Sequence, residues 1–402
     1  FVSPVQVHKF NSIRYECLHD VGGPAYTFSI DFVLDYKRLV MFLNNRKYFM
    51  RILLPLAVFS VLFMFFLTRR FDEYFPISRG EKGIFAYAHR LFHDIEFRDG
   101  VFIPASKWTE YETLNMTEKL SLLVKENASM KDPRLIDLIR KYYIEFPSKE
   151  PYALSNPTTL DYSCGQSSYI NSLLNYKEKG FFVEAGAWLG EYASTSLYFE
   201  KSRGWAGLLV EPNPENFRTL KGLNRKAFHI NACLSTHPFP VVLKLNAASD
   251  MSRTIERMED KQWVQEHNFD QKPYYEVPCF PLYSIMLAIN RTSIDYLGLD
   301  VEGNELQILK TIPFDDLDIK SLTAECLEMH GRGNESTKAV KLFLESRGFR
   351  CHGIIEASPE HSCFAEDLVF LKKDQVTQER HCEPIKNPFE ANATIHNAKS
   401  NL

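Results

Sequence analysis

The feature that most constrains this 402-residue chain is a regular alternation of short apolar segments with amphipathic ones after Gly180. The apolar segments cover residues 181–184, 208–211, 228–232, 294–300, 322–327 and 368–371, and the amphipathic ones cover 191–200, 214–223, a stretch from about 304, and 337–347. Apolar strands of this length are buried on both faces, and helices between them usually connect parallel strands. The alternation therefore predicts an α/β fold with a doubly wound parallel sheet, covered by helices on both faces.

The limits of this domain follow from local signals. Asp132 and Pro133 are typical of the N-cap and first turn of a helix, so the domain is expected to begin near residue 131 and to extend to 375. Residues 241–290 interrupt the alternation, but 241–245 and 275–280 have strand-like patterns.

The formal net charge of −4 excludes a generally basic nucleic-acid-binding protein, so no nucleic-acid partner is expected.

A second constraint is the apolar run at residues 48–68, in which Arg51 is the only charged residue. As a helix this run would span about 31 Å, enough to cross a hydrocarbon core of about 30 Å. It predicts one transmembrane helix; a buried core helix is the alternative, although such a helix usually keeps a polar face. The predicted organisation is an N-terminal cytoplasmic tail (1–47), the transmembrane helix (48–68), a stem (69–130), the folded domain (131–375) and a C-terminal tail (376–402).

The glycosylation sequons and most cysteines follow the predicted span. The sequons begin at Asn115, Asn127, Asn290, Asn334 and Asn392, and seven of the eight cysteines lie after residue 68. Both observations fit a lumenal C-terminal part in which some cysteines form disulfides, with Cys351 and Cys363 the closest couple. A metal site formed by this couple with His352 and His361 is the weaker alternative. No CxxC or HxxxH spacing supports it, so no metal site is predicted.

The segment FFVEAGAWLG at residues 181–190 carries the strongest functional signal. Its strand ends in Glu184, the following turn contains Gly186 and Gly190, and the next strand ends in Glu211. Ligands of such sheets bind at the carboxyl ends of the strands, where glycines let the backbone approach a cofactor. The spacing is not GxGxxG, which disfavours a dinucleotide. The two acids favour S-adenosylmethionine, because the Glu211 carboxylate can accept hydrogen bonds from its ribose hydroxyl groups. A turn kept for packing alone is the alternative interpretation.

A second acidic cluster, DVEGNE at residues 300–305, follows a later strand. Asp300 and Glu302 would reach the same edge of the sheet, as charge partners of the cofactor or as a general base. Alternatively, Asp300 caps the next helix and Glu302 is solvated. The segment ECLEMH at 325–330 brings His330 near the same edge, although a lone histidine there is more often structural than catalytic. The candidate catalytic residues are therefore Asp300, Glu302 and His330.

These segments, together with GLLVEPNPENFRTL, HINACLS, LGLDVEGNELQILK and DLVFLKK, resemble the FkbM-type methyltransferase domain in order and spacing over about residues 160–373. The resemblance implies a class I methyltransferase fold, S-adenosylmethionine as the cofactor, and cofactor binding by Glu184, Gly186, Gly190 and Glu211. It matches Asp300 and Glu302 to the family's DxEG segment. Leu189 stands where the resemblance predicts an acid, so weak cofactor binding is expected.

With DPRLIDLIR and SCGQ upstream and a membrane span before them, the chain more closely resembles the insect Star-like proteins. This implies a type II single-pass protein of the endoplasmic reticulum, Golgi, endosome or plasma membrane. Its implied partners are the membrane and, as cargo, membrane-anchored EGF-receptor ligand precursors. We therefore expect mainly a trafficking function. An active O-methyltransferase, with Glu211 on the ribose and Asp300 or His330 as base, is the alternative that the sequence leaves open.

Overall fold

The computed structural model describes residues 12–16, 27–31, 95–98, 101–246, 274–325, 333–356, 367–375, 382–385 and 388. The chain divides into two compact units, Phe1–Leu91 and Phe92–Leu402. In the first unit, β1 (Ser12–Glu16) pairs with β2 (Thr27–Asp31) in antiparallel orientation. The predicted transmembrane helix at 48–68 lies outside the described residues. Among the described residues, no helix is both long and apolar enough to cross a membrane.

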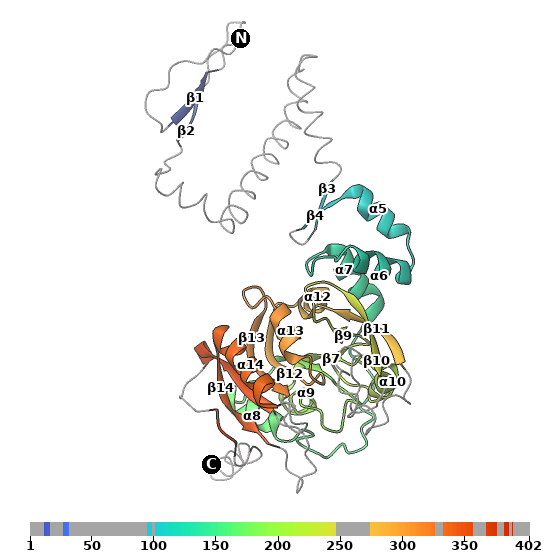
Figure 1. The fold of residues 1–402 in the computed structure, drawn as a ribbon, viewed down its shortest axis with the longest axis vertical. Coiled ribbons are helices and arrows are strands. Elements are labelled where there is room, and N and C mark those ends of the chain that lie inside the picture. The colour runs from blue at the N-terminus through green and yellow to red at the C-terminus, as the bar shows by residue number, and fades with distance from the viewer. Residues whose placement is uncertain are drawn as a thin grey trace. The chain divides into compact units, whose positions relative to one another are not determined.

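A large sheet forms the centre of the second unit (Figure 1). It has eight strands. Its order is β14-β15-β13-β12-β6-β7-β8-β5. The strands of this unit outside the insertion are β3 (Ile95–Arg98), β4 (Val101–Pro104), β5 (Ile144–Glu145), β6 (Phe181–Ala185), β7 (Ala206–Val210), β8 (Phe228–Ile230), β12 (Ser293–Leu299), β13 (Asp318–Glu325), β14 (Phe349–Ile355) and β15 (Asp367–Lys372). Strands β3 and β4 form a separate antiparallel pair.

The five central strands, β13, β12, β6, β7 and β8, run parallel to one another, which confirms the predicted α/β sheet. The prediction of an entirely parallel sheet is wrong at both edges, where β14, β15 and β5 are antiparallel to their neighbours. The connection between β14 and β15 is too short for a helical crossover, so these strands pair as a hairpin. Numbered from β6 and without β5, the order of the strands in the large sheet is 3-2-1-4-5-7-6.

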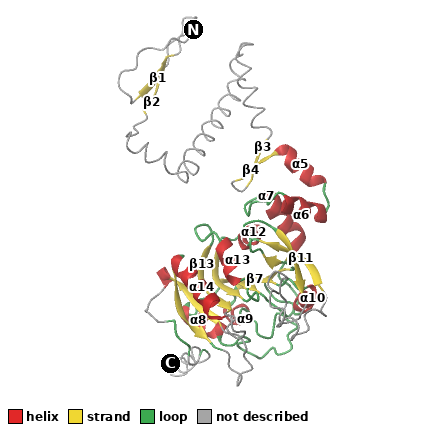
Figure 2. Ribbon diagram, in the orientation of Figure 1, coloured by secondary structure: helices red, strands yellow, loops and turns green. Residues whose placement is uncertain are grey.

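Helices cover both faces of the sheet (Figure 2). Along β6, Phe181 and Val183 point into one apolar cluster and Phe182 into another, as the alternation of side chains along a strand requires. The first cluster includes side chains of α7, α12, α13 and α14, and the second those of α8, α9 and α10. The helices are α5 (Ala105–Thr113), α6 (Met116–Lys125), α7 (Pro133–Leu138), α8 (Gln166–Leu173), α9 (Leu197–Arg203), α10 (Pro214–Gly222), α12 (Leu282–Ala288), α13 (Glu305–Thr311) and α14 (Gly333–Ser346), with short η2 (Ile139–Tyr143) and η7 (Lys373–Gln375).

Helices α5 and α6 fall in the predicted stem but pack against the folded domain. Tyr111 of α5 is fully buried, and its hydroxyl donates to the Arg134 carbonyl oxygen at 2.8 Å. Leu123 of α6 belongs to the same core cluster as the helices on one face of the sheet. Asp132 caps α7 as predicted, accepting the Arg134 backbone N–H at 2.9 Å. The folded part of the second unit therefore begins upstream of residue 131.

The insertion contributes a second, three-stranded sheet of order β10-β11-β9. Its strands are β9 (Cys233–Leu234), β10 (Val241–Asn246) and β11 (Tyr274–Phe280), which confirms the strand-like patterns at 241–245 and 275–280. A disulfide between Cys233 and Cys279 joins β9 to β11. This small sheet is therefore held beside the carboxyl ends of the large one.

Cys351 of β14 forms a disulfide with Cys382, so its predicted pairing with Cys363 is wrong. The segment that follows Cys382 lies along β14, where the Ile385 N–H donates to the Ile354 carbonyl oxygen at 2.8 Å. This pairing brings the downstream cysteine to β14. A thiol committed to a disulfide cannot ligate a metal, so the alternative metal site that included Cys351 is excluded.

Candidate functional site

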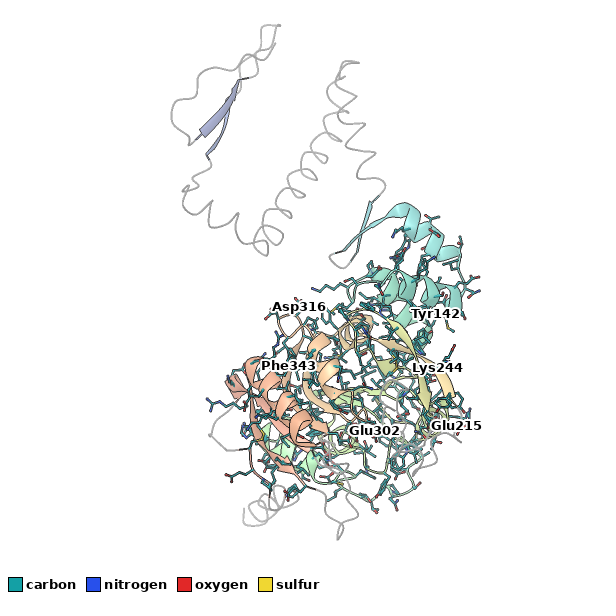
Figure 3. All side chains as sticks on the ribbon, in the orientation of Figure 1. Tyr142, Glu215, Lys244, Glu302, Asp316 and Phe343 are labelled. Carbon is teal, nitrogen blue, oxygen red and sulfur yellow. A yellow bond between two sulfur atoms is a disulfide. The ribbon has the colours of Figure 1, made fainter. Side chains whose placement is uncertain are left out.

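A pocket lies at the carboxyl ends of β6, β7 and β12, the edge at which the sequence predicted a ligand site. It is lined by Glu184, Gly186, Ala187, Trp188, Tyr192, Ala193, Ser194, Val210, Glu211, Pro212, Cys233, Leu234, Thr236, Leu243, Leu245, Asp300, Val301, Glu302, Asn304 and Ile308. Figure 3 labels Glu302 at this edge and Asp316 at the opposite edge of the sheet. Gly190 is outside the lining, and His330 lies outside the described residues.

Gly186 allows the end of β6 to turn tightly against the end of β12. Its φ is +87°, and a Cβ atom built on it would lie 1.8 Å from the Asp300 carbonyl oxygen. The backbone N–H groups of Gly186 and Ala187 both donate to the Val210 carbonyl oxygen, at 3.0 and 3.1 Å. No residue with a side chain fits this crossing. The turn that forms the floor of the pocket therefore depends on glycine at this position.

Gly190 lies outside the pocket lining and against α10. A Cβ atom there would lie 2.9 Å from Leu220 Cγ, and φ is +81°. The lack of a side chain thus lets the turn pack on α10, so the packing interpretation accounts for this glycine. Leu189 is half-buried and is not among the pocket-lining residues. Its apolar side chain therefore removes no contact from the pocket, and the weak affinity predicted from it remains a prediction.

Glu184 is buried and accepts several hydrogen bonds from the loop before α9. The Ser194 hydroxyl donates to it at 2.9 Å and the Thr195 N–H at 2.8 Å, and the Ser196 hydroxyl also donates to it. Burial raises the pKa of Glu184, although the guanidinium of Arg225 and these hydrogen bonds oppose the rise. The Glu184 carboxylate therefore fixes the position of the loop that forms one wall of the pocket.

Behind this wall lies Arg225, which is fully buried. Its Nε donates to Glu200 Oε2 at 3.0 Å, in an ion pair whose side chains are both inaccessible to solvent. Its Nη1 also donates to the Gly190 carbonyl oxygen, and its Nη2 donates to the Ser196 hydroxyl at 3.1 Å. Arg225 thus joins α9, the glycine turn and the Glu184 loop. The sequence reading missed it because Arg225 stands in a polar stretch that resembles a solvated surface.

Glu211 follows β7 and is 3% exposed. Its Oε2 accepts the Trp188 N–H at 2.8 Å, and its Oε1 accepts the Asn213 N–H at 2.9 Å. Burial raises the pKa of Glu211 to about 7, against the lowering effect of these hydrogen bonds. Its Oε1 also accepts a hydrogen bond from Asn216 Nδ2 at 3.4 Å. Since a carboxylate offers about four acceptor sites, one can remain for a hydroxyl group of a ligand. Trp188, with φ of +46°, is held in a strained conformation above this carboxylate.

Asp300 and Glu302 face Glu325 at the ends of β12 and β13. Asp300 is exposed to solvent, but the protein atoms around its carboxyl group partly desolvate it and raise its pKa, and the Glu302 carboxylate raises the pKa further. Burial and the Asp300 charge likewise raise the pKa of Glu325, which hydrogen-bonds Asp300. Two carboxyl groups that share a proton in this way can exchange it with a ligand.

The alternative in which Asp300 caps the following helix does not describe this arrangement. The N-cap of α13 is Asn304. The Glu305 carboxylate, not that of Asp300, accepts the Val301 and Gly303 N–H groups, each at 3.0 Å. Glu302 has a φ of +59°, which is unusual for a residue with a side chain. The DVEGNE segment is therefore a strained turn that holds Asp300 and Glu302 at the pocket.

The charge of the pocket distinguishes between classes of cofactor. Four carboxylates line it, those of Glu184, Glu211, Asp300 and Glu302, and its lining contains no lysine, arginine or histidine among the residues that the structure describes. This lining offers a pyrophosphate no cation, whereas those of its carboxyl groups that are ionised attract a sulfonium or ammonium group. Apolar side chains of β7 and β10 supply a surface for a flat ring.

Three of the carboxylates could also hold a divalent cation. Asp300, Glu302 and Glu325 each place one oxygen within 4.8 Å of the others. Carboxylate oxygens are the ligands that magnesium and calcium prefer. The sequence predicted no metal site, although the segment at 325–330 places Glu325, Glu328 and His330 near this edge of the sheet.

Comparison with known families agrees with the position of this pocket. The family model of the methyltransferase FkbM domain matches residues 184–351, from the acid that ends β6 to the cysteine in β14. Residues 184–351 form an FkbM methyltransferase domain. No curated protein sequence matches the chain.

Solved methyltransferase structures resemble the FkbM domain only remotely. The FkbM methyltransferase of Methylobacillus flagellatus has 15% identity and a TM-score of 0.35, and the match covers 63% of this chain and 58% of that one. The precorrin-6y C5,15-methyltransferase of Geobacter metallireducens has 13% identity and a TM-score of 0.29, with coverages of 57% and 100%. TrmK of M. capricolum, bound to S-adenosyl-homocysteine, has 12% identity and a TM-score of 0.28, with coverages of 58% and 83%.

Proposed function

We propose that the FkbM domain binds S-adenosylmethionine in the strand-end pocket and transfers its methyl group to a hydroxyl group of an acceptor. The observation that carries this proposal is the composition of the lining, which combines four carboxyl groups with no basic side chain in the described residues. S-adenosylmethionine has a sulfonium and an ammonium group and no phosphate. Dinucleotide cofactors carry phosphates, so the same lining opposes them.

Each carboxylate has a separate proposed role. Glu211 accepts a hydrogen bond from a ribose hydroxyl, because it is buried beside the turn and its oxygens keep acceptor capacity. Glu184 acts through the loop that it holds, and Gly186 lets the backbone approach the methionine part of the cofactor. When bound, S-adenosylmethionine supplies an electrophilic methyl group on a sulfonium.

Asp300 is the proposed general base, with Glu302 and Glu325 as the carboxylates that tune it. Desolvation and the neighbouring negative charge raise the pKa of Asp300, which strengthens it as a proton acceptor near neutral pH. Its carboxylate would accept the proton of the acceptor hydroxyl, and the hydrogen bond to Glu325 offers a second place for that proton. His330 remains the alternative base.

Thermal unfolding of the full chain with added ligands tests this proposal. A ligand that binds the native state raises the unfolding temperature, and its excess over Kd sets the increase. S-adenosylmethionine and S-adenosylhomocysteine should each raise it, and NADP⁺ should not. Asp300→Asn should keep the increase while losing methyl transfer. Equal stabilisation by NADP⁺, or no stabilisation by either adenosyl ligand, would contradict the proposal.

We also propose that the domain is lumenal, anchored by residues 48–68, and that it has a Star-like role in transport. The specific support is the presence of disulfides, among them Cys233–Cys279 and Cys351–Cys382. Disulfides persist in oxidising compartments and are rare in the cytosol. In the same bilayer as membrane-anchored EGF-receptor ligand precursors, tethering would raise the effective concentration to the millimolar range, so that a weak contact suffices.

Cargo arrival at the Golgi tests the transport role. Full-length chain and a variant with an unrelated span in place of residues 48–68 should both deliver cargo, whereas a secreted form without any span should not. Delivery by the secreted form would refute the tethering role. Glu211→Ala separates the two proposed functions, because an escort that does not use the pocket keeps full transport in this variant.

A further inference from the structure

We propose that Asn127 and Asn290 carry N-linked glycans, and that both glycans project from the edge of the domain opposite the pocket. The inference rests on the lumenal placement proposed above, but it goes further because it names the modified sites. Both residues begin sequons, Asn127-Ala-Ser129 and Asn290-Arg-Thr292.

Asn127 lies in an exposed turn that follows α6. Its φ is +47°, and its backbone N–H donates to the Val124 carbonyl oxygen at 3.1 Å. Its side chain makes no hydrogen bond or ion pair within the described part of the chain, and Ser129 of the sequon is exposed as well. Attachment of a glycan to the amide nitrogen therefore disrupts no contact that the fold needs.

Asn290 lies in a similar turn that follows α12. Its φ is +56°, and its backbone N–H donates to the Leu287 carbonyl oxygen at 3.0 Å. Its Oδ1 accepts a hydrogen bond from Arg140 Nη2 at 3.1 Å, so the side chain is oriented while Nδ2 makes no hydrogen bond among the described residues. Asn290 and Thr292 are both exposed. The amide nitrogen, which is the atom modified, is thus presented to solvent.

Both sites lie at the amino-terminal edge of the parallel strands. Thr292 directly precedes β12, whose seven residues span about 23 Å before Asp300 in the pocket. The turn after Asn127 reaches the same edge, because Lys131 pairs with Asp316 at 3.0 Å and the Met130 carbonyl oxygen accepts the Ser284 hydroxyl of α12 at 2.8 Å. Figure 3 labels Asp316 at this edge and Glu302 at the other. Glycans at the two sites therefore leave the pocket open.

The chemistry requires a lipid-linked oligosaccharide diphosphate as donor. Asn Nδ2 forms a bond to the anomeric carbon of the sugar, the bond from that carbon to the diphosphate oxygen breaks, and Nδ2 releases one proton. The sequon at Asn115 differs, because Asn115 caps α6 and Thr117 is already within the helix. Its side chain is engaged in a capping box with Glu118.

The test is the electrophoretic mobility of the full chain expressed in animal cells, before and after treatment with a peptide N-glycosidase. Asn127→Gln and Asn290→Gln should each remove one glycan-sized step, and the double variant should remove two. Ser129→Ala and Thr292→Ala should do the same while leaving both asparagines in place.

The chain supplies its own control for compartment. Asn156-Pro157-Thr158 is exposed but is blocked as a sequon by its proline, so Pro157→Ala should add one step if this part of the chain enters the lumen. A step at Asn156 in this variant without steps at Asn127 and Asn290 would overturn the two sites and leave the lumenal placement intact. No step in any variant would overturn both.

Discussion

Gly186→Ala should destabilise the domain far more than Gly204→Ala, although both glycines have a positive φ. The φ values are +87° and +64°, so each alanine costs about 1–2 kcal/mol for the left-handed conformation. Gly186 alone of the pair adds a clash, since its Cβ would lie 1.8 Å from the Asp300 carbonyl oxygen, whereas a Cβ at Gly204 meets nothing within 4 Å. The difference between the two variants therefore isolates the steric cost.

Relief of this clash requires the ends of β6 and β12 to move apart by well over an ångström. That movement breaks the hydrogen bonds from the Asp300 N–H to the Ala185 oxygen and from the Gly186 N–H to the Val210 oxygen, both 3.0 Å long. Each contributes about 1 kcal/mol. With the conformational strain included, Gly186→Ala should lose about 4 kcal/mol, against a typical total of about 5–15 kcal/mol.

Equilibrium urea unfolding of the full chain, followed by tryptophan fluorescence, measures both variants under the same conditions. The midpoint for Gly204→Ala should fall slightly and that for Gly186→Ala severely, with unchanged slopes if unfolding stays two-state. Equal losses for the two variants would refute the reasoning, because they would show that the turn has room for a side chain.

Three further expectations concern stability. Arg225→Met leaves its buried acidic partner unpaired and should cost about 3–5 kcal/mol by urea unfolding, whereas Lys221→Met, at an exposed pair, should cost less than about 1 kcal/mol. Reduction of Cys351–Cys382, whose cysteines are 31 residues apart, should lower the free energy of unfolding by up to about 4 kcal/mol. A Cys351→Ser variant as stable as the oxidised, unaltered chain would contradict this expectation. Burial raises the pKa of Glu211 from 4.5 to about 7, so the folded state holds this proton more tightly than the unfolded state does. The free energy of unfolding should therefore fall by about 3 kcal/mol as pH rises through that range. Glu211→Gln should abolish this fall, and a pH profile of the variant parallel to that of the unaltered chain would contradict the expectation.

The central sheet was predictable because strands buried on both faces have continuous apolar sequences, as in Phe181–Ala185. The antiparallel edges were not, because the apolar pattern of β15 is the same in either orientation. The packing of α5 and α6 was also missed. Their contribution depends on Tyr111 and Leu123, which become core residues only through contacts with α7 and the helices around it.

For the site, the sequence located the acids but could not assign their roles. Glu184 and Glu211 both end a parallel strand, yet Glu184 is held by hydroxyl groups of the loop before α9, whereas Glu211 keeps acceptor capacity. Arg225 escaped notice because nothing in its neighbourhood indicates burial, which arises from its ion pair with Glu200 on another helix. Such roles depend on tertiary contacts between distant segments, which no local pattern records.

Isothermal titration of the full chain with S-adenosylmethionine at pH 8 tests the central claim most directly. At this pH the Glu211 carboxyl is ionised, since its pKa is about 7. One molecule should bind per chain, Glu211→Ala should abolish binding, and Glu215→Ala, an exposed acid of the same helix region outside the pocket lining, should leave it unchanged. No binding by the unaltered chain, or binding that survives Glu211→Ala, would contradict the claim that this pocket holds the cofactor.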